Sequence, residues 1–426
     1  MTYYSILYRY ILDLFVQDEI KNLNIYVAAA GGTLLSFFKH FKDYSIMRNN
    51  NIYKFSIPMP FYKEHLDKVI SINKNIEKSK ITSLYFSLPT NSSDFTGFEQ
   101  DRFYWDFETD FEFWKPLIEY SLNNNFDFIY VLNSPVIYYE HYKKLPFMLE
   151  KLDKLLNNLR KTGINKVRVC NPQLMGHINK YYSDFELFIS TSSEMKIIKE
   201  YTNLFSEFKN IKECVPSWDI NKNFKLLKNL RKLFPQIKLE LMVNEGCIPA
   251  CSFRIIHNNY FNGNCPYYCY SDMFFIEKCS SKIDKNLAYY FTNTNIIYPW
   301  EIKEYSKIGI SNFKLVGRNS EYFKTGEYID YYNYYLKGID NINYIKDIAI
   351  KYLNNHLHNN NINYKVSEIM YYLPDIKHFT KFGHLCSSIC GTDCKYCYKC
   401  AEKIQKVLNK QEEKLRKKSL PICKCS

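Results

Sequence analysis

The fold is decided by a segment that runs from Lys166 to Ser190, KVRVCNPQLMGHINKYYSDFELFIS. Two short apolar runs of β-favouring residues, Lys166–Cys170 and Glu186–Ser190, flank a stretch with helical spacing of its apolar residues, Pro172–Tyr182. A strand, a helix and a second strand in this order predict two parallel strands joined by a crossover helix. The segment therefore predicts an α/β fold built on a parallel sheet.

The same alternation extends through most of the chain. We predict eight strands: Tyr53–Ile57, Ser83–Ser87, Phe126–Leu132, Lys166–Cys170, Glu186–Ser190, Ile211–Val215, Lys238–Val243 and Asn312–Val316. The predicted helices between them are Lys63–Lys78, Phe113–Asn123, Lys144–Lys161, Pro172–Tyr182, Glu194–Glu207 and Asp219–Phe234. Eight such units close a (β/α)8 barrel of the TIM type. We expect this barrel over 49–340, after an N-terminal α/β extension over 1–48 and before a helical, Cys-rich segment over 341–426.

The seventh predicted strand leads into a loop rich in cysteine. After Asn244-Glu245-Gly246 the loop contains four cysteines: Cys247, Cys251, Cys265 and Cys269. Converging thiolates bind iron or zinc, and the loop after a barrel strand is where this fold carries functional groups. Four unrelated buried thiols are the alternative, but the interleaved Gly, Pro and Asn residues do not suit a core. The spacing therefore favours a metal site.

Polar residues follow the predicted strands, where a barrel forms its catalytic face. These positions are Pro58, Leu88, Asn133, Asn171, Thr191, Pro216, Asn244 to Cys247, and Gly317-Arg318. Asn residues and Arg318 suit recognition of carboxylate, amide or phosphate oxygens. Glu245 is either a general base or a solvated carboxylate, and His257 is either a metal ligand or acid or a structural histidine. For Arg254 the simplest expectation is pairing with a carboxylate.

A second group of cysteines lies near the C-terminus. It comprises Cys386, Cys390, Cys394, Cys397 and Cys400. Five thiols within so short a stretch indicate a metal site that holds zinc or an iron–sulfur cluster. Because either centre needs four thiolates, one cysteine is spare, and we expect it to be Cys400.

Composition limits the class of protein and its partners. Twelve of the 14 cysteines lie after residue 246, whereas a secreted disulfide scaffold spreads its cysteines along a short chain. We expect a reducing, cytoplasmic environment, and no membrane span, because no apolar run reaches the length of a spanning helix. The formal charge of +13 suits RNA or an anionic metabolite without identifying either.

Three stretches resemble the U32 peptidase-like family, which includes collagenase-like peptidases and oxygen-independent hydroxylation factors for ubiquinone biosynthesis and for RNA. They are VRVCNPQLMGHINKYYSDFELFISTSSEM, VPSWDINKNFKLLKNLRKLFPQIKLELMVNEGC and FKLVGRN. The resemblance implies a TIM-type barrel with a 4Fe–4S cluster held by four cysteines. Cys265 and Cys269 match the family's later pair, Cys247 or Cys251 its earlier ligands, and Cys279 a late ligand. The chain departs from the family by having Asn244-Glu245-Gly246 where a His-Gly step is usual.

This resemblance leads to one main hypothesis and several alternatives. The main hypothesis is an iron–sulfur enzyme for oxygen-independent hydroxylation, or a related modification, of a small molecule or RNA. A redox partner or a related U32 partner protein is expected with it. A collagenase-like peptidase is the first alternative, although no paired nucleophile and base is evident. A radical-SAM-like enzyme, suggested by Cys390-x3-Cys394-x2-Cys397, and a non-catalytic RNA-binding protein are the others.

Overall fold

A computed structural model gives the structure of the protein. It describes residues 52–88, 96, 110–134, 145–245, 247, 249–252, 254, 295–316, 326–341, 397–406 and 409. The predicted extension over 1–48 and most of the predicted segment over 341–426 lie outside these residues, so the domain boundaries stay predictions. Within the described residues, no helix combines the length and the apolar character that crossing a membrane requires.

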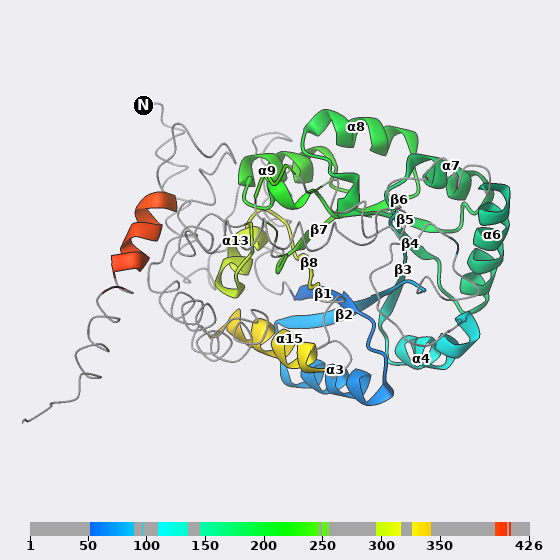
Figure 1. Ribbon diagram of the computed structural model, residues 1–426, viewed down its shortest axis with the longest axis horizontal. Coiled ribbons are helices and arrows are strands. Elements are labelled where there is room, and N and C mark those ends of the chain that lie inside the picture. Colours follow the sequence, from blue (N-terminus) through cyan, green and yellow to red (C-terminus); the bar gives the residue numbers. More distant parts are fainter. Residues whose placement is uncertain are drawn as a thin grey trace, which may run out of the picture. The chain divides into compact units, whose positions relative to one another are not determined.

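Eight parallel strands close a barrel in chain order (Figure 1). The strands are β1 Tyr53–Pro58, β2 Ser79–Phe86, β3 Asp127–Leu132, β4 Lys166–Val169, β5 Glu186–Ile189, β6 Ile211–Cys214, β7 Lys238–Met242 and β8 Asn312–Lys314. The ring closes where Lys54 of β1 pairs with Asn312 of β8. The predicted (β/α)8 fold and all eight predicted strands are confirmed.

Helices surround the strands on the outside of the barrel (Figure 1). They are α3 Lys63–Asn75, α4 Phe111–Asn123, α6 Leu145–Lys161, α7 Pro172–Tyr181, α8 Ile198–Glu207, α9 Phe224–Leu233, α13 Ile302–Ser306 and α15 Glu327–Gly338. Three of them begin after a polar residue, Asp110, Asn171 or Asn223, whose side chain accepts backbone N–H bonds from the first turn. These caps stabilise the helix ends next to the barrel mouth.

Alternation along each strand separates two sets of side chains. In β4, Val167 and Val169 join the large apolar core between the strands and the helices. The intervening residue, Arg168, is fully buried and bonded to carboxylates on β6 and β7. A separate apolar cluster combines residues of β2, β3 and β5, namely Tyr85, Ile129, Val131 and Phe188. Every second strand residue therefore faces the barrel interior, and the last ones face its mouth.

Two helices begin later than the sequence predicts. Helical spacing places their starts at Glu194 and Asp219, whereas α8 begins at Ile198 and α9 at Phe224. Single 3-10 turns, η1 Thr191–Ser193 and η2 Trp218–Ile220, precede them instead. Glu194 itself adopts a left-handed conformation with φ 48°, which no α-helix accommodates. The predicted starts are wrong because these residues form loops at the barrel mouth.

Candidate functional site

The candidate site lies at the carboxyl ends of β5, β6 and β7, where three loops meet. The first two loops open with the turns η1 and η2, and each turn is closed by a serine. Ser190 Oγ accepts the Ser192 N–H at 3.3 Å, and Ser217 Oγ accepts the Asp219 N–H at 3.4 Å. The third loop follows β7 and carries the first two cysteines of the predicted metal site. Short capped turns thus bring acidic side chains next to the cysteine loop.

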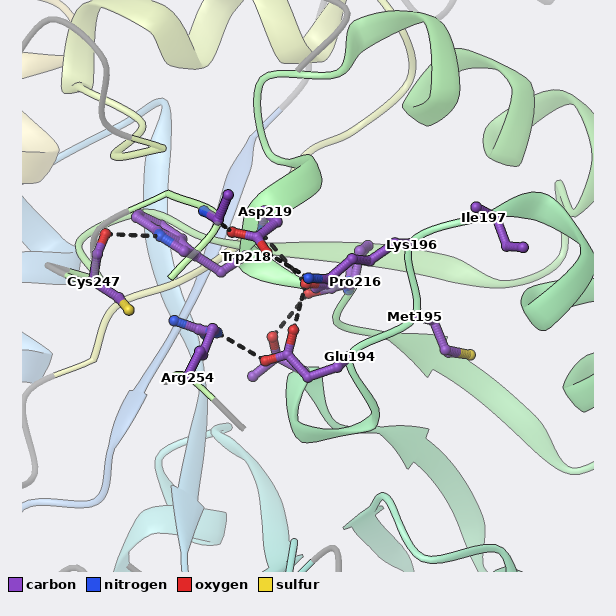
Figure 2. Close-up of polar contacts among 12 residues, drawn as sticks. Glu194, Met195, Lys196, Ile197, Pro216, Trp218, Asp219, Cys247 and Arg254 are labelled. Carbon is purple, nitrogen blue, oxygen red and sulfur yellow. Dashed lines mark hydrogen bonds and ion pairs between the residues drawn. The ribbon is translucent and has the colours of Figure 1, made fainter. Parts of the chain in front are cut away.

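Glu194 links all three loops. Its carboxylate accepts a hydrogen bond from Ser217 Oγ at 2.7 Å and an ion-pair hydrogen bond from Arg254 Nε at 2.8 Å (Figure 2). The side chains of Glu194 and Arg254 are 13% and 7% exposed, so the pair is largely removed from water. The left-handed backbone of Glu194 costs about 1–2 kcal/mol in a residue with a Cβ. The structure therefore keeps a strained residue at the point where a carboxylate meets the cysteine loop.

Arg254 also lies beside the first cysteine. Its guanidinium lies next to the Cys247 thiol (Figure 2), so its positive charge acts on that thiol, and the charge of the Glu245 carboxylate acts on the guanidinium. Burial raises the pKa of Cys247 to about 12, and the charge of Arg254 opposes that rise. Burial lowers the pKa of Arg254, but the negative charges of Glu245, Cys247 and Glu194 outweigh it and raise that pKa overall. Without a bound metal, Cys247 is therefore a neutral thiol near neutral pH, and the cation of Arg254 lies beside it to stabilise the thiolate that a metal would bind.

Two further contacts hold the backbone of the cysteine loop. Trp218 Nε1–H donates to the Cys247 carbonyl at 3.3 Å, and Asp219 Oδ1 accepts the Ala250 N–H at 3.0 Å (Figure 2). Asp219 is also paired with Lys196 Nζ at 2.5 Å. The Cys247 side chain packs against an apolar cluster of Val215, Trp218 and Met242. Groups on the β5 and β6 loops thus support the loop after β7 along its described length.

The donor set fits a thiolate-bound metal in part. Cys247 and Cys251 are both free thiols, both half-buried, and close enough to interact electrostatically. Soft thiolate sulfur is the donor that iron–sulfur clusters and zinc prefer. Among the described residues, no group of three or more His, Cys, Asp or Glu side chains converges as a metal site. A complete centre therefore requires ligands from positions outside the described residues.

Several predicted site residues lie outside the described part of the chain. These are His257, Arg318, Cys265, Cys269, Cys279, Cys386, Cys390 and Cys394. Of the C-terminal group, Cys397 and Cys400 are described, on a helix over 397–406, with Cys400 buried. Positions three apart share one helix face, so both thiols lie on the same side of that helix. The roles predicted for all of these residues remain predictions.

The predicted Asn-rich rim has a partly structural role. Asn171 accepts the first N–H groups of α7, and the Asn244 amide donates to the Val316 carbonyl at 2.8 Å and accepts its N–H at 2.7 Å. The two hydrogen bonds between Asn244 and Val316 join the ends of β7 and β8. These two amides hold the barrel rim together, and recognition of a ligand is left to the other predicted positions.

The barrel interior contains a group of charges that the sequence analysis missed. Arg168 of β4 is fully buried and donates from Nη2 to Glu213 of β6 at 2.8 Å and to Glu240 of β7 at 2.6 Å. Lys314 of β8 lies 4.1 Å from the ring centroid of Tyr85 on β2. The sequence carries a signal for three of these charges, since Arg168, Glu240 and Lys314 each lie between two apolar residues.

This interior group holds an unusual carboxyl. Burial, and next the charge of Glu240, raise the pKa of Glu213 to about 8, while Arg168 lowers it by less. Burial lowers the pKa of Arg168, but the two glutamates outweigh it and raise that pKa overall. The single guanidinium of Arg168 therefore pairs with the carboxyl groups of both Glu213 and Glu240. Near neutral pH Glu213 keeps its proton.

Comparison with known proteins identifies the family. The model of peptidase family U32 matches residues 116–366, more than half of the chain. The chain belongs to peptidase family U32. The U32 protein is also 23% identical, over 350 residues, to an uncharacterized protease of Methanocaldococcus jannaschii, across 80% of this chain and 94% of that relative.

Solved structures give weaker likenesses. A U32 peptidase structure is 10% identical with a TM-score of 0.39, covering 63% of the U32 protein and 94% of the solved chain. The N-acetylneuraminate lyase of Fusobacterium nucleatum is 12% identical with a TM-score of 0.33, covering 84% and 99% of the two chains. The barrel assignment rests on the strand order and pairing of the U32 protein itself.

Proposed function

We propose that this U32 protein is an iron–sulfur enzyme that catalyses oxygen-independent hydroxylation, or a related modification, of a small molecule or RNA. The observation that supports it most is the Cys247 thiol at the barrel mouth beside the buried cation of Arg254. Structural thiols in an apolar core have no use for a neighbouring guanidinium, whereas a thiolate ligand does. The resemblance of the cysteine loop to that of the family points to the same centre.

In this proposal Cys247 and Cys251 hold one side of a 4Fe–4S cluster. Cys265, Cys269 and Cys279 are the candidates for the remaining ligands. When bound, such a cluster supplies electron transfer or Lewis acidity. Inserting oxygen into a C–H bond oxidises the substrate by two electrons. If the oxygen comes from a donor other than O2, that donor is reduced by the same two electrons. If the oxygen comes from water, a separate electron acceptor must take the two electrons.

The chain's own residues have distinct tasks in the proposal. Arg254 neutralises negative charge at the Cys247 sulfur, and Trp218 covers the loop on its apolar side. Glu245, half-buried and acting on Arg254, is the candidate to accept or deliver a proton at its carboxylate. His257 and Arg318 are the further candidates for acid and anion-binding roles. Of the C-terminal cysteines, Cys386, Cys390, Cys394 and Cys397 would hold zinc or a second cluster, with Cys400 as the spare thiol.

Metal and sulfide analysis tests this proposal directly. Protein purified without oxygen should contain iron and acid-labile sulfide and absorb visible light. Replacing both Cys265 and Cys269 with serine should lower iron from about eight to about four atoms per chain if the C-terminal cysteines hold a second cluster. If they hold zinc, iron should fall from about four to near zero while zinc stays unchanged. A colourless wild-type protein that contains neither iron nor sulfide would end the proposal.

A peptidase is the second candidate, because of the family's name and the protease description of the archaeal relative. Cleavage of a peptide panel that survives both chelation and replacement of the loop cysteines would favour it over the iron–sulfur enzyme. The expected redox or U32 partner protein and the cytoplasmic location belong to the main proposal. A pull-down from a cell extract, with the Cys265→Ser/Cys269→Ser double variant as the control, tests the partner.

A further inference from the structure

Glu194 is a carboxylate whose position no sequence pattern indicated. Its φ of 48° lies in the region that glycine occupies without strain, yet the residue carries a long charged side chain. Its N–H closes the turn η1 through the Thr191 carbonyl at 2.9 Å, so the backbone cannot relax without opening that turn. The strained backbone directs the carboxylate away from its own loop and toward Ser217 and Arg254.

The cysteine loop depends on contacts made by its neighbours. Its described residues form no strand, and its anchors are the Cys247 carbonyl, the Ala250 N–H and the Arg254 guanidinium. Each anchor is held by a side chain from the β5 or β6 loop, as Figure 2 shows for Trp218 and Glu194. Arg254 is the anchor whose side chain lies beside the thiol (Figure 2).

We propose that Glu194 is a positioning residue, which acts through Arg254 to hold the Cys247 thiol in its ligand position before any metal binds. The proposal rests on the proposed function, because it takes Cys247 to be a metal ligand. A site whose ligands are held by a supporting shell binds its metal without first ordering the loop. The Glu194–Arg254 pair is such a support, since it is buried and joins two different loops.

The shape of the guanidinium explains why the bridging residue is arginine. Arg254 donates to Glu194 through Nε, while its guanidinium lies beside Cys247 and its charge acts on the thiol (Figure 2). The ammonium of lysine is a single point charge and cannot span both partners in this way. An Arg254→Lys substitution keeps the positive charge but removes the bridge between Glu194 and Cys247. This variant therefore tests the positioning role of Arg254 separately from the effect of its charge.

Hydrogen–deuterium exchange of the full-length, metal-free protein tests the proposal. In Glu194→Gly the carboxylate is lost while the left-handed backbone becomes unstrained, so the barrel is expected to stay folded. Peptides covering 247–254 should then exchange about tenfold faster than in the wild type. Glu194→Gln and Arg254→Lys should give the same direction of change. Unchanged protection of this loop in all three variants would overturn the proposal.

Asp184→Asn is the matched control. It removes a carboxylate from the exposed Arg160–Asp184 pair, whose atoms lie 2.6 Å apart, against 2.8 Å in the Glu194–Arg254 pair. This control pair lies before β5, at the other end of the strand. Its exchange over 247–254 and its EPR spectrum after reconstitution and reduction should match the wild type. The spectrum of Glu194→Gly should differ, because the cluster ligand has moved.

Iron binding separates the two proposals. If wild-type protein takes up no iron, the proposed function fails, while the exchange data still decide whether Glu194 holds the loop. If the wild type takes up iron and Glu194→Gly does so at the same rate, with the same spectrum and the same loop protection, Glu194 is no positioning residue and the proposed function stands.

Discussion

Replacing Glu213 with glutamine should change how the stability of the protein depends on pH. The pKa of this carboxyl is raised from 4.5 to about 8, first by burial and then by the charge of Glu240. Between these two pH values the folded protein keeps a proton that the unfolded chain releases. Stability is therefore lost as pH rises through this window, with most of the loss complete by about pH 8. At about 1.4 kcal/mol per pKa unit, the loss amounts to about 5 kcal/mol.

Glutamine mimics the protonated carboxyl and does not titrate. Glu213→Gln should thus resemble the wild type near pH 5 and exceed its free energy of unfolding by up to about 5 kcal/mol near pH 9. Urea unfolding under reducing conditions, followed by far-UV circular dichroism at several pH values, measures the difference. The control Glu112→Gln, on the exposed surface of α4, should stay within about 1 kcal/mol of the wild type. Parallel stability curves for Glu213→Gln and wild type would refute the protonated interior.

Four further substitutions can be measured by the same urea unfolding. Arg168→Met should lower the free energy of unfolding by about 3–5 kcal/mol, because it leaves the interior glutamates without their cation. Arg160→Met, in a surface pair, should lower it by less than about 1 kcal/mol. Asn221→Ala should cost about 2 kcal/mol, since two buried backbone carbonyls lose their donor. Gly326→Ala should cost about 2 kcal/mol, because the new Cβ would lie 2.6 Å from His65 Nε2 and φ is +77°. Adding His65→Ala should recover only the steric part.

The strands were predictable because burial imposes a local pattern. In Asp127–Leu132 the β-favouring residues are contiguous in the chain, and helical spacing fills the intervals between the strands. The order of such units indicates a parallel sheet, and right-handed crossovers between eight successive strands are compatible with one closed ring. The loop after β7 was predictable for a similar reason, since its cysteines are close together in the sequence.

The partners of the cysteine loop were not predictable in the same way. Glu194 and Arg254 are 60 residues apart, and Glu194 falls in a stretch with acceptable helical spacing. Only the left-handed turn after β5 moves its carboxylate to the neighbouring loop. The expected pairing of Arg254 with a carboxylate is confirmed, but no sequence pattern identifies Glu194 as that carboxylate.

The amino-acid order alone determined the barrel class, the sequence of its strands and the loop that carries Cys247 and Cys251, because each depends on residues close together in the chain. The tertiary structure alone decided that Arg168 meets Glu213 and Glu240, and that Glu194 meets Arg254 beside Cys247. These contacts join different strands and loops, so they exist only once the ring of strands has closed. Burial then strengthens them, because charges removed from water interact far more strongly with each other than they do in the unfolded chain.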